Sequence, residues 1–451
     1  MADQIIVSKF GGSSMADEAA MDRSAKIAQR QNSSIVLVSA TYGTTDKLLE
    51  LIKTAQEGNW PTCEKLLFNL REKHFDILGN FTNDTNHTES LKALLKELET
   101  LSRGIFLLKE CSDKARDQLL SLGERMSSLL FSLSYKNLFP EKDVVLLDAR
   151  DVIITDDKHT KARPQIDLIE RKAKEVFNFA KQRVYISQGF IGKTEAGHTT
   201  TLGRGGSDYS AALFAQAVNA NVLEIWTDVA GIASTDPRIC KAARPIHEIS
   251  YDEASEMAQY GAKILHPTTL VPAMQKNIPV FVGSSYEGDA KGTWIRQEVK
   301  DKPLIRALAK RSDQALLTIR TPKMLNAVGF MGNIFGVFSN HQISVDCVTT
   351  SEISVSVSID RSVMEHKALI KDLEAFGEVS FETGQALISL IGNKILSTHG
   401  LAKDLFNALG EINVRMMCLG ASAHNFNLLV AEQDCNVAVQ RLHQKFIEAC
   451  N

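Results

Sequence analysis

Six short apolar runs, separated by longer helical stretches, place the tightest limits on how the first two thirds of the chain can fold. The runs cover residues 5–7, 34–40, 143–149, 183–192, 222–229 and 278–285. Amphipathic stretches such as 89–109 and 114–137 lie between several of them. Apolar strands that alternate with helices are typical of a parallel sheet covered by helices on both faces. We therefore expect an α/β domain, in which "IGKTEAGHTTTL" (191–202) forms a hairpin.

An internal repeat follows residue 300. "QALLTI" begins at Gln314, and "QALISL" begins 71 residues later at Gln385. The same offset carries Gly329 onto Gly400 without a gap. Each copy predicts a strand, a helix, two strands and a second helix. Two copies of this length predict a pair of small domains that act together as one regulatory module.

Length and composition narrow the class of protein. A chain of 451 residues is too long for one core and predicts two or three domains. The formal net charge of −3 gives no reason to expect nucleic acid or an anionic membrane as a partner. The sequence has neither a membrane-length apolar run nor the pattern of a secretory signal. Its seven scattered cysteines, without C-x-x-C, predict neither a disulfide scaffold nor a zinc site and favour the cytoplasm.

The segment "VSKFGGSS", which begins at Val7, is a candidate phosphate site. Lys9 ends a short apolar run, and Gly11 and Gly12 precede a helical stretch. A cation and free backbone N–H groups beside a helix N-terminus attract phosphate. The segment matches neither the P-loop nor the dinucleotide-binding fingerprint, so its site must be of another kind.

The segment "TTTLGRGGSDYSAAL", which begins at Thr199, is a second candidate of the same type. Its glycines would allow a ligand close to the backbone, and Arg204 adds a positive charge. Ser207 is expected to cap a helix that Asp208 opens. A glycine-rich loop could also be only a tight turn, but two loops that each link a strand to a helix favour a binding site.

Further candidates lie in "WTDVAGIASTDPR" and beyond it. Thr227 and Asp228 follow a strand, where ligands bind in doubly wound sheets. Asp236 precedes a proline and could simply reverse the chain. Arg238 and Lys263 could screen phosphate charge or be solvated surface residues.

Glu124 stands out within "SLGERMSSLL", an otherwise apolar helical stretch. A carboxylate in this position is either a partnered helix residue or a ligand for a substrate ammonium group. The sequence leaves both interpretations open.

Taken in order, these segments resemble the successive motifs of the aspartate kinases. The motifs are "VSKFGGSS", "SLGERMS", "TTTLGRGGSDYSAAL", "WTDVAGI…TDPR", "GAKILHPTTL" and "IPVFVGSS". The repeat resembles that family's two ACT domains, and the whole is most similar to its monofunctional, lysine-sensitive bacterial type. The resemblance implies an amino acid kinase fold over residues 1–298 and ferredoxin-like ACT domains over 299–382 and 383–451.

The resemblance also implies a reaction. It is the transfer of the γ-phosphoryl group of ATP to the side-chain carboxylate of L-aspartate, which gives 4-phospho-L-aspartate for lysine, threonine and methionine synthesis. That carboxylate is already ionised at pH 7, so the nucleophile needs no general base. The expected mechanism is direct in-line transfer without a phosphoenzyme, with Mg²⁺ held mainly through the ATP phosphates rather than by a metal site of the protein.

Residue roles follow from the same resemblance. The catalytic residues would be Lys9, at the transferring phosphate, and Asp208, beside Lys9 and the metal. Aspartate would be bound by Ser39, Thr45, Glu124, Arg204 and Ser207. The nucleotide would be bound by Lys9, Gly11, Gly12, Thr227, Asp228, Asp236, Arg238 and Lys263.

The two repeat copies differ in charge, which indicates an effector. The first copy carries Asp346 and Glu352, where the second has Met417 and Ala423. A free amino acid with a side-chain ammonium needs carboxylate partners, so the first copy is equipped for lysine. By resemblance the pocket is completed by Phe330, Val345 and Ser351. The two acids could instead be solvated charges at strand ends. ACT domains usually pair between subunits, which implies a homodimer or tetramer.

Two alternatives stay open, and two departures from the family pattern bear on the second of them. Asp46 stands where the family usually has Asn, and Ala233 where it commonly has Tyr. One alternative is another amino acid kinase, directed at glutamate or carbamate. The other is a catalytically inactive amino-acid sensor in which only the repeat functions.

Overall fold

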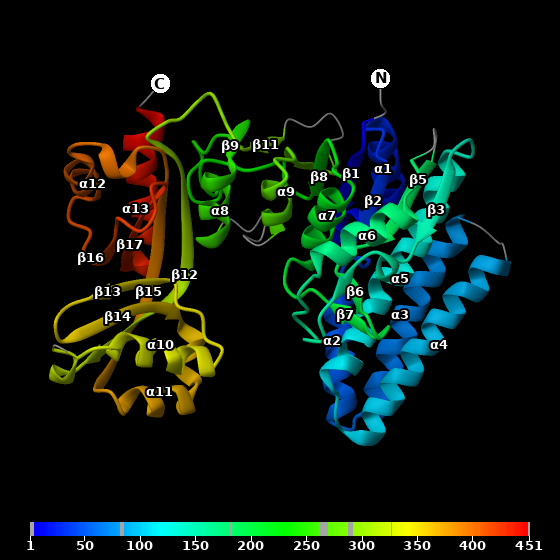
Figure 1. Cartoon of the computed structure of the whole chain (residues 1–451), viewed down its shortest axis with the longest axis horizontal. Coiled ribbons are helices and arrows are strands. Elements are labelled where there is room, and N and C mark those ends of the chain that lie inside the picture. The colour runs from blue at the N-terminus through cyan, green and yellow to red at the C-terminus, as the bar shows by residue number, and fades with distance from the viewer. Residues whose placement is uncertain are drawn as a thin grey trace. The chain divides into compact units, whose positions relative to one another are not determined.

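The computed structural model of the chain forms two compact units (Figure 1). It describes residues 4–81, 85–179, 183–261, 269–286, 292–325 and 327–449. The first unit consists of Met1–Ile232, Ile246–Tyr251 and Ile264–Val299. The second unit consists of Ala233–Pro245, Asp252–Lys263 and Lys300–Asn451. The second unit therefore holds the repeat together with two short segments that come earlier in the sequence.

The first unit is built on an eight-stranded sheet. In spatial order its strands are β3 (Asp143–Leu147), β5 (Arg183–Gln188), β2 (Ile35–Val38), β1 (Ile6–Phe10), β8 (Val222–Thr227), β10 (Val280–Ser284), β11 (Thr293–Arg296) and β9 (Glu248–Ser250). Neighbouring strands are parallel except β10 and β11. The mainly parallel sheet expected from the apolar runs is confirmed.

Helices cover both faces of this sheet. On one face α5 (Asp113–Leu138) packs on β2, β3 and β5. Around it lie α1 (Glu18–Arg30), α2 (Thr44–Gln56), α3 (Trp60–Phe81) and α4 (Thr85–Leu108). The other layer contains α6 (Ile166–Val176), α7 (Gly206–Ala217) and α9 (Val271–Gln275). Phe10, Phe131 and Trp226 belong to the core between the sheet and α5.

The region after β5 differs in part from the sequence expectation. The hairpin is confirmed: β6 (Ile191–Thr194) pairs antiparallel with β7 (Thr199–Thr201), and it pairs parallel with β4 (Ile154–Thr155) on its other side. The single strand expected over 183–192 is wrong, because the chain turns at Phe190, whose φ is 70°. The run of apolar side chains continues through that turn, so hydrophobicity alone could not locate the break.

The second unit confirms the predicted repeat. Its first copy contains β12 (Ile305–Arg320), α10 (Phe330–Asn340), β13 (Cys347–Thr350), β14 (Ser354–Asp360) and α11 (Lys367–Glu374). Its second copy contains β15 (Glu378–Gly392), α12 (Leu401–Leu409), β16 (Val414–Cys418), β17 (Asn425–Ala431) and α13 (Glu432–His443). Gly329 and Gly400 occupy equivalent left-handed positions before α10 and α12, with φ of 79° and 78°.

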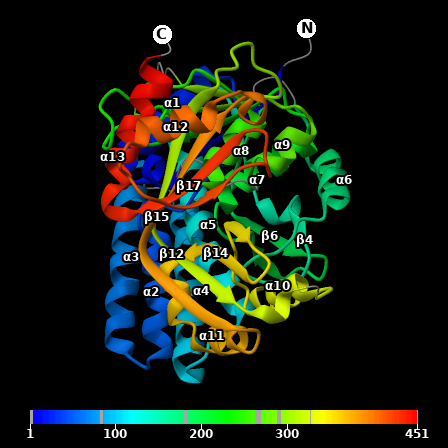
Figure 2. The same ribbon diagram turned by 90° about the vertical axis from the view of Figure 1, so that its left-hand side faces the viewer.

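The two long strands β12 and β15 pass through both copies (Figure 2). The second half of β12 pairs with β14, and the second half of β15 pairs with β17. The first half of β12 pairs with the second half of β15, and the first half of β15 pairs with the second half of β12. The sheet of each copy therefore includes half of a strand that belongs to the other copy. Two separate apolar cores result, one around Ile334 and Phe338 and one around Leu405 and Phe426.

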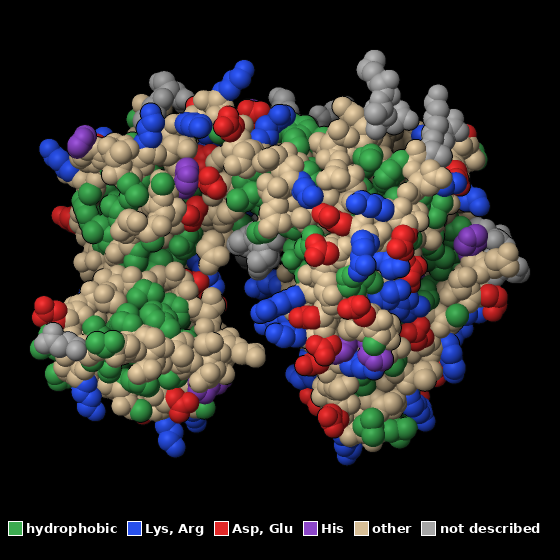
Figure 3. Space-filling view, viewed as in Figure 1, with side chains coloured by type: hydrophobic (Ala, Val, Ile, Leu, Met, Phe, Trp, Pro, Cys, Tyr) green, Lys and Arg blue, Asp and Glu red, His purple; other side chains and the backbone are tan. Residues whose placement is uncertain are grey.

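Two further features concern the charged side chains at the surface and the apolar character of the helices. On the face shown in Figure 3, acidic and basic side chains are interspersed over the first unit, whereas the second unit shows broad hydrophobic areas with charged side chains mostly near their edges. Among the described residues, no helix combines the length and apolar character needed to cross a lipid bilayer.

A buried ion pair anchors β12 within the second unit. Arg306 Nε lies 2.8 Å from Glu253 Oε1, and their side chains are 7% and 0% exposed. Glu253 belongs to α8 (Tyr251–Gln259), and Asn393 donates to the same carboxylate oxygen. Arg306 also lies 3.4 Å from the exposed Asp301, so loss of Arg306 removes the ion pair that offsets the desolvation of the buried Glu253 carboxylate.

We expect Arg306→Leu to destabilise the second unit by about 3–5 kcal/mol, because it leaves Glu253 charged and buried. Chemical denaturation followed by circular dichroism would measure the change. Arg320→Leu, at the exposed end of the same strand, is the matched control and should cost less than about 1 kcal/mol. Equal midpoints for the two variants would contradict the assignment of β12's anchor to this pair.

Candidate active site at the carboxyl ends of the strands

The predicted catalytic segments meet at one edge of the first unit's sheet. Strand β1 pairs with β2 on one side and with β8 on the other. The chain order of the parallel strands reverses at this point, and open α/β sheets bind ligands at the carboxyl ends beside such a reversal. Lys9 lies near the end of β1, Ser39 directly follows β2, and Thr227 ends β8.

Lys9 forms an ion pair with Asp208 at this edge. The Lys9 Nζ and Asp208 Oδ1 atoms are 2.6 Å apart, and the two side chains are 10% and 15% exposed. The residues are far apart in sequence, and α7 brings the carboxylate to the central strand because that helix packs on β1. The pair holds a mostly desolvated ammonium group in a fixed place, where electrostatic attraction to phosphate is stronger than in water.

Helix α7 begins at Gly206, two residues earlier than the sequence analysis expects. Its N-cap is Gly205, in a left-handed conformation with φ of 70°, and no side chain caps it. The expected cap at Ser207 is wrong: Ser207 and Asp208 both lie in the first turn. A left-handed backbone favours glycine over serine, which explains the difference. The first-turn N–H groups therefore have no side-chain cap, as in anion-binding helix termini.

Two glycines near this helix are required for packing. A Cβ at Gly206 would lie 2.6 Å from Phe190 Cδ2. A Cβ at Gly189, which directly follows β5, would lie 2.6 Å from Ser207 Cβ. Gly206 is therefore needed so that α7 can approach the β5–β6 turn, a reason other than ligand access. Gly189 was missed by the sequence analysis, although a glycine at a strand end was a visible signal.

Gly11 has a different environment. Its backbone conformation, with φ of −74°, suits any residue, and its N–H donates to the Trp226 carbonyl oxygen. A Cβ there would lie 3.8 Å from Lys9 Nζ and 3.7 Å from the Trp226 oxygen, which are ordinary contact distances. The folded chain does not require glycine at this position, so the space beside the Lys9 ammonium is open. At Gly12 a Cβ would lie 3.3 Å from the Ala40 oxygen.

Glu124 is buried beside the end of β2. Only 4% of the residue is exposed, and the Ala40 N–H donates to its carboxylate. Burial raises the pKa of Glu124 to about 8. Within the described ranges its carboxylate forms no ion pair. A carboxyl group held in this way would gain from an added ammonium group, because the added charge would offset desolvation of the ionised form.

The other predicted substrate residues are more open. Ser39 and Thr45 are half-buried, and the Ser39 N–H donates to the Phe10 carbonyl oxygen. Arg204 is exposed and, among the described residues, makes no ion pair. Asp46, a departure from the family pattern, is exposed in the first turn of α2. A carboxylate in that position stabilises the helix, which gives Asp46 a structural role.

The predicted nucleotide residues fall into separate groups. In the first unit, Thr227 Oγ1 donates to Asp228 Oδ1 over 3.1 Å. In the second unit, Arg238 lies 2.7 Å from Asp236, and its hydrogen bonds lower the pKa of that carboxyl. The Arg238 side chain is 86% exposed. Lys263 lies outside the described residues.

One buried carboxylate escaped the sequence analysis. Asp117 on α5 is completely buried and accepts hydrogen bonds from Thr201 Oγ1, at 2.6 Å, and from the Thr160 N–H. His159 Nδ1 lies 2.9 Å from it. Asp117 precedes Glu124 by seven residues, so both occupy one face of the helix. That spacing of two acids on an apolar helix was the available signal. Asp117 fixes β7, which leads into the glycine-rich loop before α7.

The predicted effector residues lie around β13 in the second unit. Asp346 directly precedes the strand, and its side chain is 4% exposed and 2.7 Å from Arg311. Burial raises the pKa of Asp346, while Arg311 opposes that change. Ser351 and Glu352 are exposed at the other end of the strand, in the turn to β14. Val345 adjoins Asp346, and Phe330 begins α10. Asp346 is thus not a solvated charge, and it already has a cationic partner.

Comparison with known proteins identifies both parts of the chain. Residues 4–284 match the amino acid kinase family, and residues 317–369 and 388–446 match an ACT domain. The chain is 42% identical over 456 residues to lysine-sensitive aspartokinase 3 of Escherichia coli, covering 99% of this chain and 100% of that protein. It is 33% identical to chloroplastic aspartokinase 1 of Arabidopsis thaliana, covering 98% of this chain and 80% of that protein.

Solved structures give the same relationship. The chain resembles Escherichia coli aspartokinase III in complex with aspartate and ADP, in the R-state, with a TM-score of 0.88, 40% identity and coverage of 98% and 99%. It also resembles that enzyme in complex with lysine and aspartate, in the T-state, with a TM-score of 0.84, 41% identity and coverage of 99% and 100%. With an amino acid kinase fold, two ACT domains and full-length similarity of this kind, the chain belongs to the aspartokinase family of ATP-dependent aspartate kinases.

Proposed function

We propose that Lys9 and Asp208 form the catalytic centre of this aspartokinase. The observation that carries the proposal is their mostly buried ion pair at the reversal point of the sheet, beside the first turn of α7. Lys9 contacts the γ-phosphoryl group as it moves from ATP to aspartate. Asp208 fixes the ammonium group of Lys9 so that little reorganisation is needed during transfer.

The chemistry matches these groups. Two anions, ATP and the aspartate carboxylate, must approach each other, and negative charge spreads over the transferring oxygens. Lys9, the first-turn N–H groups of α7 and Arg204, which lies two residues before that helix, supply positive charge. The acceptor carboxylate is ionised at neutral pH, so direct in-line transfer proceeds without a general base or a phosphoenzyme.

ATP brings Mg²⁺ with it in this proposal. In the first unit, the described residues contain no group of three metal-ligating side chains, and the carboxylate of Asp208 is already engaged by Lys9. These residues fit a metal held mainly by phosphate oxygens, with Asp208 nearby. Bound in this way, Mg²⁺ neutralises phosphate charge. In this proposal the nucleotide is bound by Gly11, Gly12, Thr227, Asp228, Asp236, Arg238 and Lys263.

Glu124 binds the α-ammonium group of aspartate. Its raised pKa and its lack of an ion pair among the described residues support this role. The remaining aspartate contacts come from Ser39, Thr45, Arg204 and Ser207, with Arg204 as the partner of a carboxylate.

Lysine is the proposed feedback inhibitor and acts on the first ACT copy. The similarity to an aspartokinase named as lysine-sensitive supports this assignment. Asp346 and Glu352 flank β13, which is about 13 Å long at about 3.3 Å per residue. Lysine has two ammonium groups, each of which can pair with a carboxylate, whereas threonine has one. Phe330, Val345 and Ser351 complete the pocket.

Pairing of subunits through the ACT copies is also proposed. The sheet's two edge strands, β13 and β16, lie next to each other, and Cys418 Sγ is 3.6 Å from the Val348 carbonyl oxygen. Val348, Met417 and Leu419 on this surface are 36%, 44% and 47% exposed. A second copy of the chain would bury such an apolar surface.

The six described cysteines are free thiols, in agreement with a cytoplasmic location.

The first test addresses the catalytic centre. We expect Lys9→Met to lower kcat/KM at least 100-fold with ATP and aspartate, because it removes a charge aimed at the transition state. Trapping the product with hydroxylamine as the hydroxamate measures the rate. Gly11→Ala is the companion variant: its Cβ fits the fold, so thermal stability should not change while KM for ATP rises. Wild-type kinetics in Lys9→Met would overturn the assignment.

The second test uses the raised pKa of Glu124. A carboxyl whose pKa rises from 4.5 to about 8 on folding stabilises the folded state fully below pH 4.5 and loses this contribution as pH rises through 8. We expect Glu124→Gln to remove that loss, so the variant should gain stability relative to wild type at pH 8.5 compared with pH 6. Thermal unfolding at the two pH values measures it.

The same variant should raise KM for aspartate roughly 10- to 100-fold, because a hydrogen bond to a charged group is lost. Glu97→Gln, on α4, is a control for charge removal in the same unit. An unchanged KM for aspartate would leave Glu124 as a structural residue only.

The third test addresses the effector. We expect Glu352→Gln to raise the lysine concentration for half-inhibition at least tenfold while basal activity stays the same, since the exposed side chain contacts no catalytic residue. Glu374→Gln, an exposed acid of α11 in the same copy, should leave inhibition unchanged. Inhibition by threonine and not by lysine would refute the lysine assignment without affecting the catalytic proposal.

A further inference from the structure

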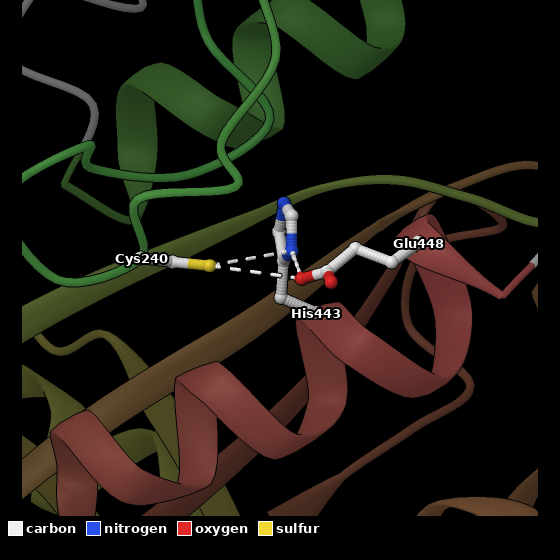
Figure 4. A group of neighbouring side chains, drawn as sticks. All are labelled: Cys240, His443 and Glu448. Carbon is white, nitrogen blue, oxygen red and sulfur yellow. Dashed lines mark hydrogen bonds and ion pairs between the residues drawn. The ribbon is translucent and has the colours of Figure 1, made fainter.

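Three potential metal ligands from different segments of the chain lie close together in the second unit (Figure 4). All three are far from Lys9 in the sequence. Cys240 comes from the short segment 233–245, whereas His443 ends α13 and Glu448 ends the π-helix that follows. Their side chains point toward one another. In the described parts of the chain, this is the one group of three such side chains with ligand atoms within 4.8 Å of each other.

The distances between the ligand atoms are close to those of a tetrahedral zinc site. Cys240 Sγ lies 3.5 Å from His443 Nδ1 and 3.8 Å from Glu448 Oε1. His443 Nδ1 lies 2.7 Å from the same Glu448 oxygen. Zinc at its usual bond lengths separates sulfur from nitrogen by about 3.5 Å and nitrogen from oxygen by about 3.3 Å. The sulfur distances already fit, and the nitrogen–oxygen pair needs to open by about half an ångström.

An uncommon backbone segment creates this arrangement. In an α-helix, residues five apart point about 140° away from each other, so His443 and Glu448 would diverge. The chain instead forms a π-helix over Gln444–Glu448, and the Ala449 N–H donates to the Gln444 carbonyl oxygen. The wider turn places both side chains on one side. Single π-helical turns inside proteins frequently occur at functional sites.

The surroundings of His443 suit a metal ligand. Its ring is completely buried, and Nε2 lies 2.9 Å from Ser234 Oγ. Metal-binding histidines usually hold the second ring nitrogen with such a partner, which fixes the ring. Cys240 is 7% exposed, whereas the Glu448 side chain is 31% exposed and leaves a path from solvent.

We propose that Cys240, His443 and Glu448 bind one Zn²⁺ ion, with water as the fourth ligand. A thiolate, a neutral imidazole and a carboxylate carry two negative charges, which balance the ion. This combination of sulfur, nitrogen and oxygen suits zinc better than Mg²⁺ or Ca²⁺, which prefer oxygen alone. The scattered cysteines gave no sign of zinc in the sequence, because 203 residues separate Cys240 from His443.

The site would tie a predicted nucleotide-binding turn to the second ACT copy. The Cys240 N–H donates to the Asp236 carbonyl oxygen, so the cysteine ends the turn that carries Asp236 and Arg238. Gln440 of α13 also donates to the Ile239 carbonyl oxygen over 2.7 Å. Zinc would strengthen this link between the turn and α13.

The experiment is a metal titration of the full chain, without an affinity tag, after treatment with a chelator and desalting. We expect one Zn²⁺ per chain in competition with a chromophoric chelator. Co²⁺ should substitute and show a thiolate-to-metal charge-transfer band. Cys240→Ser should abolish that band and weaken Zn²⁺ binding at least tenfold. Zinc should also raise the melting temperature of the wild type.

Two variants keep the test decisive. Glu448→Gln can still accept a hydrogen bond from His443, so it should fold normally but bind Zn²⁺ at least tenfold more weakly. Cys111→Ser, at a thiol of the first unit, should bind as the wild type does. If the wild type binds less than one ion per chain at micromolar zinc, or if Cys240→Ser keeps wild-type affinity, the three side chains are a hydrogen-bonded cluster only and the proposal is wrong.

Discussion

The ion pair between Lys9 and Asp208 joins the two halves of the catalytic sheet. Lys9 belongs to the first strand, and Asp208 belongs to α7, which follows the β6–β7 hairpin in the sequence. A mostly desolvated ammonium group needs a fixed anionic neighbour, so the helix must dock with its first turn at the end of β1. Gly189 and Gly206 allow that docking because any side chain there would collide with Ser207 or Phe190. The position of the ion pair therefore depends on the close packing at Gly189 and Gly206, neither of which belongs to the pair.

The chain keeps its binding groups in different electrostatic states. Lys9 has its carboxylate partner before any ligand binds, whereas Glu124 is buried with the Ala40 N–H as its hydrogen-bond donor. The first arrangement suits the phosphate site that we propose, and the second suits the proposed site for an ammonium group. This difference agrees with a reaction that brings an amino acid and a nucleotide to one sheet edge.

The regulatory unit is more interwoven than two consecutive domains. Strands β12 and β15 each contribute to both copies, so neither copy has a complete sheet of its own. Arg311 lies near the middle of β12 and holds both Asp346 and Asp360. A ligand that competes for Asp346 would therefore act on a strand that both copies share. Two states with different contacts at this strand would satisfy the physical requirement for allosteric control.

The sequence alone determined the class of fold, the repeat and the segments that carry the chemistry. Apolar runs that alternate with helices predict a parallel sheet, because a strand that is buried on both faces is itself a nearly continuous run of apolar residues. Gly329 and Gly400 likewise showed that the copies are equivalent. The sequence could not separate β5 from β6, because Phe190 continues the apolar run while its backbone turns. It also placed the helix cap at Ser207 instead of Gly205, since that choice depends on one left-handed residue. Only the tertiary structure decided which distant groups meet. It paired Lys9 with Asp208 and Asp346 with Arg311, and it brought Cys240 to His443, because such contacts depend on how whole elements pack rather than on spacing along the chain.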